Sequence, residues 1–141
     1  MATSSGEDEA PAPLSLAGKL RLGVEVLVLY ARTRLAMSRD DLPTVAARLR
    51  ARQSPARPVS KAARLRLEAV VMRVLAHLPT DSPCLVHSFV LLALLERRGA
   101  RPKLVIGVTA GPEFEAHAWV ECDDEALLPT GSGKYKPITT I

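Results

Sequence analysis

Apolar residues recur at three- and four-residue steps in the first half of the chain, the spacing that places them on one face of a helix. This pattern predicts helices from Ser15 to about Met37 and from Ser60 to about His77, with Ser60 as an N-cap. Between them it predicts a short helix that starts at Asp40 or Asp41, has Pro43 near its first turn, and runs from Thr44 to about Arg52. A further segment from Pro83 to about Arg98 is apolar nearly all round, which indicates a buried helix.

Beyond Lys103 the pattern changes to β-branched residues and two-residue alternation. It predicts strands at 104–109, 114–122 and 125–129, a tight turn at 123–124, and a last edge segment in the tail. This order predicts an α+β fold, with N-terminal helices followed by a buried central helix packed on an antiparallel sheet. At 141 residues the chain is most simply one compact domain. Its predicted parts are a disordered tail at 1–13, a helical segment at 14–78 and a core at 79–141.

Basic residues are concentrated in the helical segment. Residues 14–78 hold 13 Lys and Arg against 4 Asp and Glu, whereas residues 79–141 hold 6 against 8. Nucleic acid, an acidic partner or a solvated face could each account for this imbalance. Because the cations are spread out with few aromatic residues between them, we expect no nucleic-acid binding and favour a polar surface or a protein partner. The first helix could lie on a membrane surface, but packing on the domain or on a partner is the favoured interpretation.

The termini and the thiols bear on cellular location. No stretch approaches the roughly 18 uncharged apolar residues of a membrane span. The acidic residues 1–13 lack the basic start of a secretory signal. Two cysteines make no disulfide framework, so we expect reduced thiols, as in the cytoplasm. No Cys and His spacing matches a zinc site, and no glycine-rich phosphate loop is present.

The segment Ser82-Pro83-Cys84-Leu85 is predicted to begin the buried helix. Ser82 suits the N-cap and Pro83 the first helical position. Cys84 then lies in the first turn, where the helix dipole favours a thiolate, and backbone N–H groups around Leu85 are natural oxyanion donors. Cys84 is therefore a candidate nucleophile, although a lone cysteine in a helix is more often a small core residue.

The second predicted strand supplies a candidate base. Alternation places His117 on the same face as Trp119, which is either a core residue or part of the substrate surroundings. A lone histidine on a strand is more often packed or solvent-exposed than catalytic. His87, one helical turn after Cys84, is an alternative base.

A third group would have to orient the imidazole. If the turn at 123–124 has two residues, position 117 faces Thr130, whose hydroxyl could orient the ring weakly. Asp123 or Asp124 could do so only if the turn is built differently.

These segments together resemble the transglutaminase-like cysteine peptidases of lasso-peptide biosynthesis. The resemblance covers about residues 80–141, and the Arg-rich helical segment resembles the front part of the stand-alone members. It is carried by Cys84-Leu85-Val86-x-Ser88, by Arg97-Arg98-Gly99, by the strand at 104–108, and by Glu115-Ala116-His117-Ala118-Trp119-Val120-Glu121.

The resemblance implies a transglutaminase-like or papain-like core in which Cys84 is the nucleophile and His117 the general base. The family's third residue is an Asp about a dozen residues after the His, where this chain has Pro129 and Thr130. The implied activity is removal of the leader from a precursor peptide, with no cofactor. The implied partners are that precursor, a separate leader-binding protein and an ATP-dependent cyclase. The alternative is a weakly active or inactive protein that binds the precursor or scaffolds the maturation complex.

Overall fold

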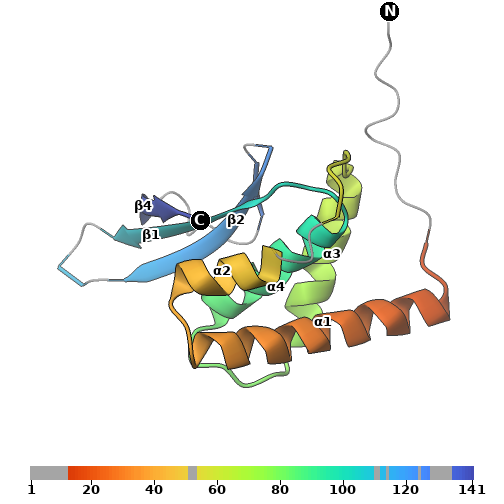
Figure 1. The fold of residues 1–141 in the computed structure, drawn as a ribbon, viewed down its shortest axis with the longest axis horizontal. Helices are drawn as coiled ribbons and strands as arrows, with labels where there is room; N and C mark the ends of the chain where they lie inside the picture. The colour runs from red at the N-terminus through yellow and green to blue at the C-terminus, as the bar shows by residue number, and fades with distance from the viewer. Residues whose placement is uncertain (1–12, 51–53, 110–111, 114, 124, 128–134) are drawn as a thin grey trace, which may run out of the picture.

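The computed structural model describes residues 13–50, 54–109, 112–113, 115–123, 125–127 and 135–141. Within them helices come first and strands follow, as predicted (Figure 1). The helices are α1 (Leu16–Met37), α2 (Leu42–Arg50), α3 (Lys61–Leu75) and α4 (Pro83–Arg97). The strands are β1 (Lys103–Thr109), β2 (Ala116–Cys122), β3 (Glu125–Leu127) and β4 (Tyr135–Thr140). The predicted α+β class is confirmed, and all but one residue of the predicted tail at 1–13 lies outside the described residues.

Side-chain caps fix where the first three helices begin. The N–H of Gly18 donates to Ser15 Oγ, and the N–H of Ala63 donates to Ser60 Oγ, both at 3.1 Å. Helix α2 begins directly after Asp41, one of the two predicted starts, and the carboxylate of Asp41 accepts the N–H of Thr44 at 3.0 Å. These bonds satisfy donors that a helix start leaves without an intrahelical partner.

The strands form one antiparallel sheet in the order β3-β2-β1-β4. Val120 lies opposite Leu127 and Cys122 opposite Glu125, which is the register that a two-residue turn at 123–124 requires. The predicted edge segment is β4, which pairs with β1 with a register shift between Ile106 and Gly107. The register of the β2–β3 hairpin is therefore as the sequence predicts.

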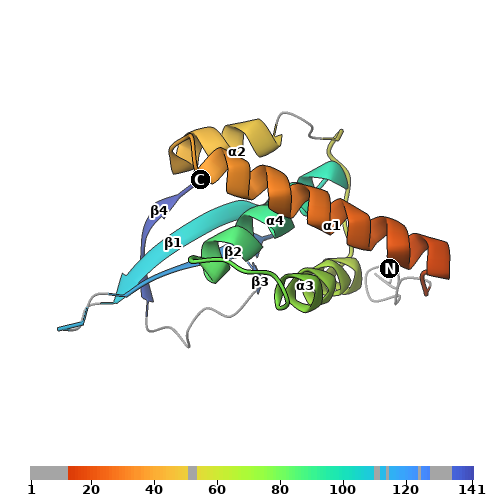
Figure 2. The same ribbon diagram turned by 90° about the horizontal axis from the view of Figure 1, so that it is seen from below.

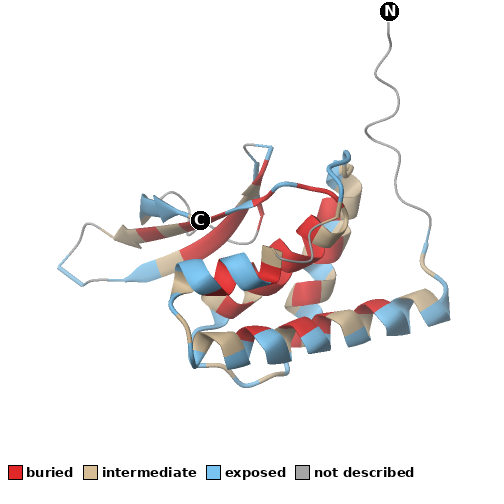
Figure 3. Cartoon of the chain, viewed as in Figure 1, coloured by how far each residue is buried: buried red, intermediate tan, exposed pale blue. Residues whose placement is uncertain are grey.

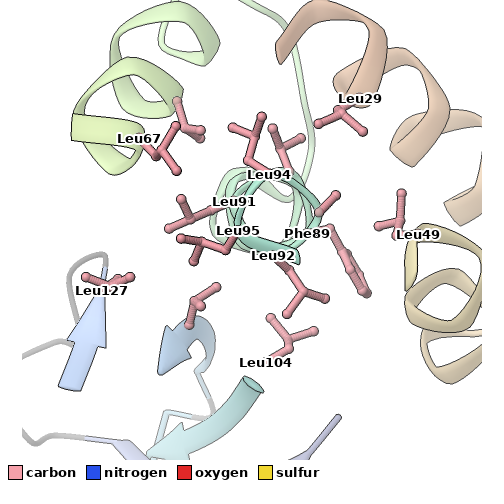
Figure 4. Close-up of a cluster of buried hydrophobic side chains, with 14 of the residues drawn as sticks. Leu29, Leu49, Leu67, Phe89, Leu91, Leu92, Leu94, Leu95, Leu104 and Leu127 are labelled. Atoms are coloured by element: carbon pink, nitrogen blue, oxygen red, sulfur yellow. The ribbon is translucent and has the colours of Figure 1, made fainter. Parts of the chain in front are cut away.

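Helix α4 lies at the centre of the molecule. Figure 4 shows it end-on, with α1, α2 and α3 on its other sides and the sheet beneath. Its residues 88–96 are all buried, and the sheet meets it with one face (Figure 3). That face carries Leu104, Ala118, Val120 and Leu127. The apolar circumference predicted for this segment is therefore explained by neighbours on every side.

A buried ion pair ties the end of α4 to α2. Arg50 Nε donates to Glu96 Oε1 at 2.6 Å, and Arg50 Nη2 donates to the carbonyl oxygens of Pro102 and Ile141. Burial raises the pKa of the Glu96 carboxyl, although the bond from Arg50 acts in the opposite direction. The second carboxylate oxygen of Glu96 is buried, and no hydrogen-bond partner for it lies among the described residues. The pair and the further bonds of Arg50 therefore join the end of α2 to the end of α4, to the segment before β1 and to the last residue, at the cost of a partly unsatisfied charge on Glu96.

None of the helices in the described residues is both long enough and apolar enough to cross a membrane.

Glu96 is expected to make stability depend on pH. Because its folded-state pKa lies above its ordinary value of 4.5, the folded chain holds the proton more tightly than the unfolded chain. Through this group the free energy of unfolding rises as the pH falls from neutral toward about 4.5. Glu96→Gln removes this contribution, so the stability of the variant relative to the wild type should decrease as the pH falls over that range.

Urea denaturation of both proteins at several pH values measures the free energy of unfolding. The exposed Glu113→Gln serves as the control, and a relative stability of Glu96→Gln that does not change with pH would contradict the prediction.

Candidate active site

Cys84 is the second residue of α4 and lies half-buried at the edge of the core. Ser82 precedes the helix as predicted, but the prediction that its hydroxyl caps the first turn is wrong. Its ψ of 70° differs from the 164° and 153° of the capping residues Ser15 and Ser60, so its side chain is not directed at the first turn. Among the hydrogen bonds of the described residues, none uses the N–H of Cys84 or Leu85. Two backbone donors therefore remain beside the thiol.

The segment that leads into α4 is held by α1. The hydroxyl of Tyr30 and the guanidinium of Arg34 both donate to the carbonyl oxygen of Pro79, each at 2.5 Å. Arg34 also donates to the Tyr30 hydroxyl at 3.0 Å, and the N–H of Ser82 donates to Thr80 Oγ1 at 3.2 Å. These bonds position the start of α4, and with it Cys84, against α1.

His117 belongs to a cluster of stacked rings on the sheet, which we call the aromatic cluster. Its imidazole stacks on Tyr135, with ring centroids 5.0 Å apart, and on Trp119, with centroids 6.0 Å apart. The Tyr135 hydroxyl donates to a carboxylate oxygen of Glu115 at 3.1 Å. Trp119 Nε1 donates to Glu121 at 3.1 Å. The imidazole thus has a tyrosine as a neighbour that the sequence did not indicate.

Gly107 makes the aromatic cluster possible. It pairs with His117 across β1 and β2, and a Cβ at this position would lie 2.8 Å from Trp119 and 3.0 Å from Cβ of Tyr135. Any larger residue would displace the rings that lie over the backbone here. A glycine inside a β-branched strand is the sequence signal that could have revealed this close approach.

The structure brings the elements that carry Cys84 and His117 together, since α4 packs on β2. Their side chains, however, take opposite directions. Ala118 and Val120 belong to the core around α4, whereas His117 alternates with them and lies with Trp119 and Gly107 on the other face of the sheet. A contact between thiol and imidazole would need the beginning of β2 to rearrange. The pairing of these two residues stays a prediction.

The three candidates for the orienting group have different outcomes. Asp123 follows β2 at the end away from His117, and its carboxylate accepts a hydrogen bond from Arg64 at 2.5 Å. It is therefore not placed to orient His117. Asp124 and Thr130 lie outside the described residues, so their predicted roles stay predictions.

His87 lies half-buried on α4, one turn after Cys84. Burial lowers the pKa of its imidazole, which keeps the ring neutral and able to accept a proton at neutral pH. Residues three apart on a helix lie on neighbouring parts of its surface. His87 thus fits the alternative base that the sequence offered.

Cys122 differs from Cys84 in its surroundings. It is buried, and burial raises the pKa of its thiol, an effect that nearby Arg64 opposes. A buried neutral thiol is a poor nucleophile. Across the described residues, no three His, Cys, Asp or Glu side chains gather as metal ligands would.

Comparison with models of protein families matches residues 27–140 to the transglutaminase-like superfamily. The chain belongs to this superfamily. The matched region begins within α1 and includes both Cys84 and His117. The superfamily includes cysteine peptidases, and the arrangement of α4 on an antiparallel sheet is consistent with its core. Comparisons with curated proteins and with solved structures give no match.

Gly107→Ala tests the aromatic cluster. The added methyl group would contact Trp119 and Tyr135 at distances that side chains do not tolerate, so we expect a loss of about 1–3 kcal/mol in the free energy of unfolding. Trp119 is the single tryptophan, so its fluorescence should change as well. The control is Gly23→Ala on α1, where no atom lies near the added Cβ and the helix should gain up to about 1 kcal/mol. An unchanged fluorescence and stability of Gly107→Ala would contradict the proposed packing.

Proposed function

We propose that this protein is a cysteine peptidase with Cys84 as its nucleophile. The observation that carries the proposal is the place of Cys84 in the first turn of α4, beside backbone N–H groups that no described side chain caps. The positive end of the helix dipole supports a thiolate there. Membership of the transglutaminase-like superfamily supports the same chemistry.

The reaction would be acyl transfer. The thiolate attacks a peptide carbonyl, and the N–H groups of Cys84 and Leu85 donate to the oxyanion that forms. The peptide C–N bond then breaks, and a protonated imidazole gives its proton to the departing amine. Water, deprotonated by the same imidazole, hydrolyses the thioester and restores the thiol.

Two imidazoles are candidates for the base. The resemblance to lasso-peptide peptidases supports His117, which requires that substrate binding or motion of the beginning of β2 bring its ring to the thiol. The geometry of α4 supports His87, which lies on the same helix as Cys84 and has a pKa lowered by burial.

The substrate proposed is a ribosomally made lasso-peptide precursor, from which the leader is cut. The freed amine of the core peptide would then pass to an ATP-dependent cyclase. A separate leader-binding protein would deliver the precursor, and the setting proposed is the cytoplasm. These steps rest on the sequence resemblance described above.

A second candidate function is binding of the precursor without cleavage. The observation that favours it is the direction of His117, whose ring lies on the face of the sheet away from α4. A protein of this kind would bind the precursor at the same surface but would not cleave it.

Cys84→Ala should lower cleavage of a candidate precursor by about a thousandfold or more, because the acyl intermediate can no longer form. Mass spectrometry of the products, with a leader-binding protein present, measures the rate. Cys122→Ala is the matched control and should cleave normally if it folds, as circular dichroism would show. Equal cleavage by Cys84→Ala and the wild type would exclude Cys84 as the nucleophile.

The two candidate bases are separated by His117→Ala and His87→Gln. Replacement of the histidine that acts as the base should reduce the cleavage rate about a hundredfold or more and remove the acidic limb from the pH profile of that rate. Replacement of the other histidine should leave both the rate and the profile unchanged. The same variants should be compared for the rate at which iodoacetamide alkylates Cys84. If both variants cleave like the wild type, neither histidine is the base. If the wild type itself never cleaves but binds the precursor, the second candidate function is supported.

A further inference from the structure

The outward side of α1 carries a row of large apolar side chains, between 42% and 75% exposed. Steps of three or four residues separate the first four, an adjacent valine and a leucine seven residues further on continue the row, and all face away from the buried Leu22, Val26 and Leu29 of the same helix. Figure 2 shows α1 crossing the underside of the molecule, with none of the other described helices or strands over it. We call this row the α1 stripe; its members are Leu16, Leu20, Val24, Leu27, Val28 and Leu35.

A continuous apolar row on the surface of a monomer usually marks a contact site. Scattered apolar residues on a surface need no explanation, but six of the eight large exposed apolar residues in the described chain belong to this one helix. Packing of α1 on the domain does not need them, since a separate face of the helix fills that role. The packing of α1 on the domain therefore does not explain the α1 stripe.

The surroundings of the α1 stripe are cationic. Lys19, Arg21 and Arg32 are exposed on the same helix. Glu25 is the one acidic residue of α1, and it is engaged by Arg97 at 3.4 Å and by Arg98 at 3.0 Å. A partner that covers the α1 stripe must therefore bring negative charge to its margins.

A cavity of about 280 Å³ lies at the C-terminal end of the α1 stripe, between α1 and α2. Leu29, Leu35 and Leu49 supply apolar lining, and Arg32 and Arg39 supply cations. Among the described residues neither of these arginines has an ion-pair partner, whereas Arg48 in the same cavity is paired with Asp40 at 2.8 Å. The cavity thus fits an apolar side chain with a carboxylate beside it.

We propose that the α1 stripe and this cavity form a docking surface for a partner protein that presents an acidic amphipathic helix. Its apolar face would lie on the α1 stripe, one apolar side chain would enter the cavity, and its Asp and Glu residues would meet Arg21, Arg32 and Arg39. A second copy of this chain fits less well, because two such faces would bring the same cations together with no free carboxylate on α1 to oppose them. The cavity favours a protein over a bilayer, which has no side chain to insert.

The inference does not depend on Cys84 or on cleavage, so its test uses binding alone. The probe is a synthetic helical peptide of about 18 residues with Leu at every third or fourth position and Glu between them. The same peptide with Lys in place of Glu is its charge control. Fluorescence anisotropy of the labelled peptides measures the dissociation constant for the full chain.

The variants are chosen at exposed positions, and circular dichroism checks that each folds. Leu20→Glu combined with Leu27→Glu should weaken binding of the Glu peptide about tenfold or more. Leu65→Glu, at a similarly exposed leucine on α3, should change it by less than about twofold. Arg32→Glu should also weaken binding and make it less sensitive to salt.

The binding of the Glu peptide decides the proposal. No binding, binding equal to that of the Lys peptide, or binding that the double variant leaves unchanged would each overturn it. Vesicles of phosphatidylglycerol that sediment the wild type but not the double variant, without binding of the Glu peptide, would assign the α1 stripe to a membrane surface instead. Light scattering that shows a dimer in the wild type and a monomer in the double variant, again without peptide binding, would assign it to a second copy.

Discussion

Burial of α4 is the interaction on which the other elements depend. An apolar helix of this kind cannot be left against water on any side, because each buried leucine contributes on the order of 1.5–3 kcal/mol by leaving it. The helices α1, α2 and α3 and one face of the sheet together close around it (Figure 4). The Arg50–Glu96 pair then fixes the last turn of α4 to α2 and to the end of the chain. The two halves of the sequence therefore contribute to one hydrophobic core.

The same burial explains where chemistry can occur. The middle of α4 is inaccessible, but its first turn emerges at the edge of the core, where Cys84 is half-buried and the bonds from Tyr30 and Arg34 to Pro79 hold the preceding segment. A thiol at this boundary has a fixed backbone around it and one side open to solvent. The imidazole of His117 lies across the sheet in the aromatic cluster, so completion of a Cys–His pair is a question of motion at the beginning of β2.

Helix α1 serves two surfaces at once. One face contributes Leu22, Val26 and Leu29 to the core, and the other carries the α1 stripe with its cationic margins. This division explains why α1 has apolar residues on all sides. Helix α4 has the same kind of sequence, but it is buried on every side, whereas one side of α1 is exposed. It also gives the positive charge of the helical segment a role other than solvation.

Much of this protein was determined by the sequence alone. Periodicity sufficed for the helices and strands, for the central place of α4 and for the two-residue turn between β2 and β3, because each depends on local spacing and on the burial of adjacent residues. The prediction of Ser82 as a side-chain cap was wrong, because its ψ of 70° differs from that of the capping serines, and residue type alone does not determine that angle. The face on which His117 lies relative to α4, the ring of Tyr135 beside it and the exposure of the α1 stripe were decided only by tertiary structure. Alternation shows which residues share a face, but only packing selects the face that the central helix covers.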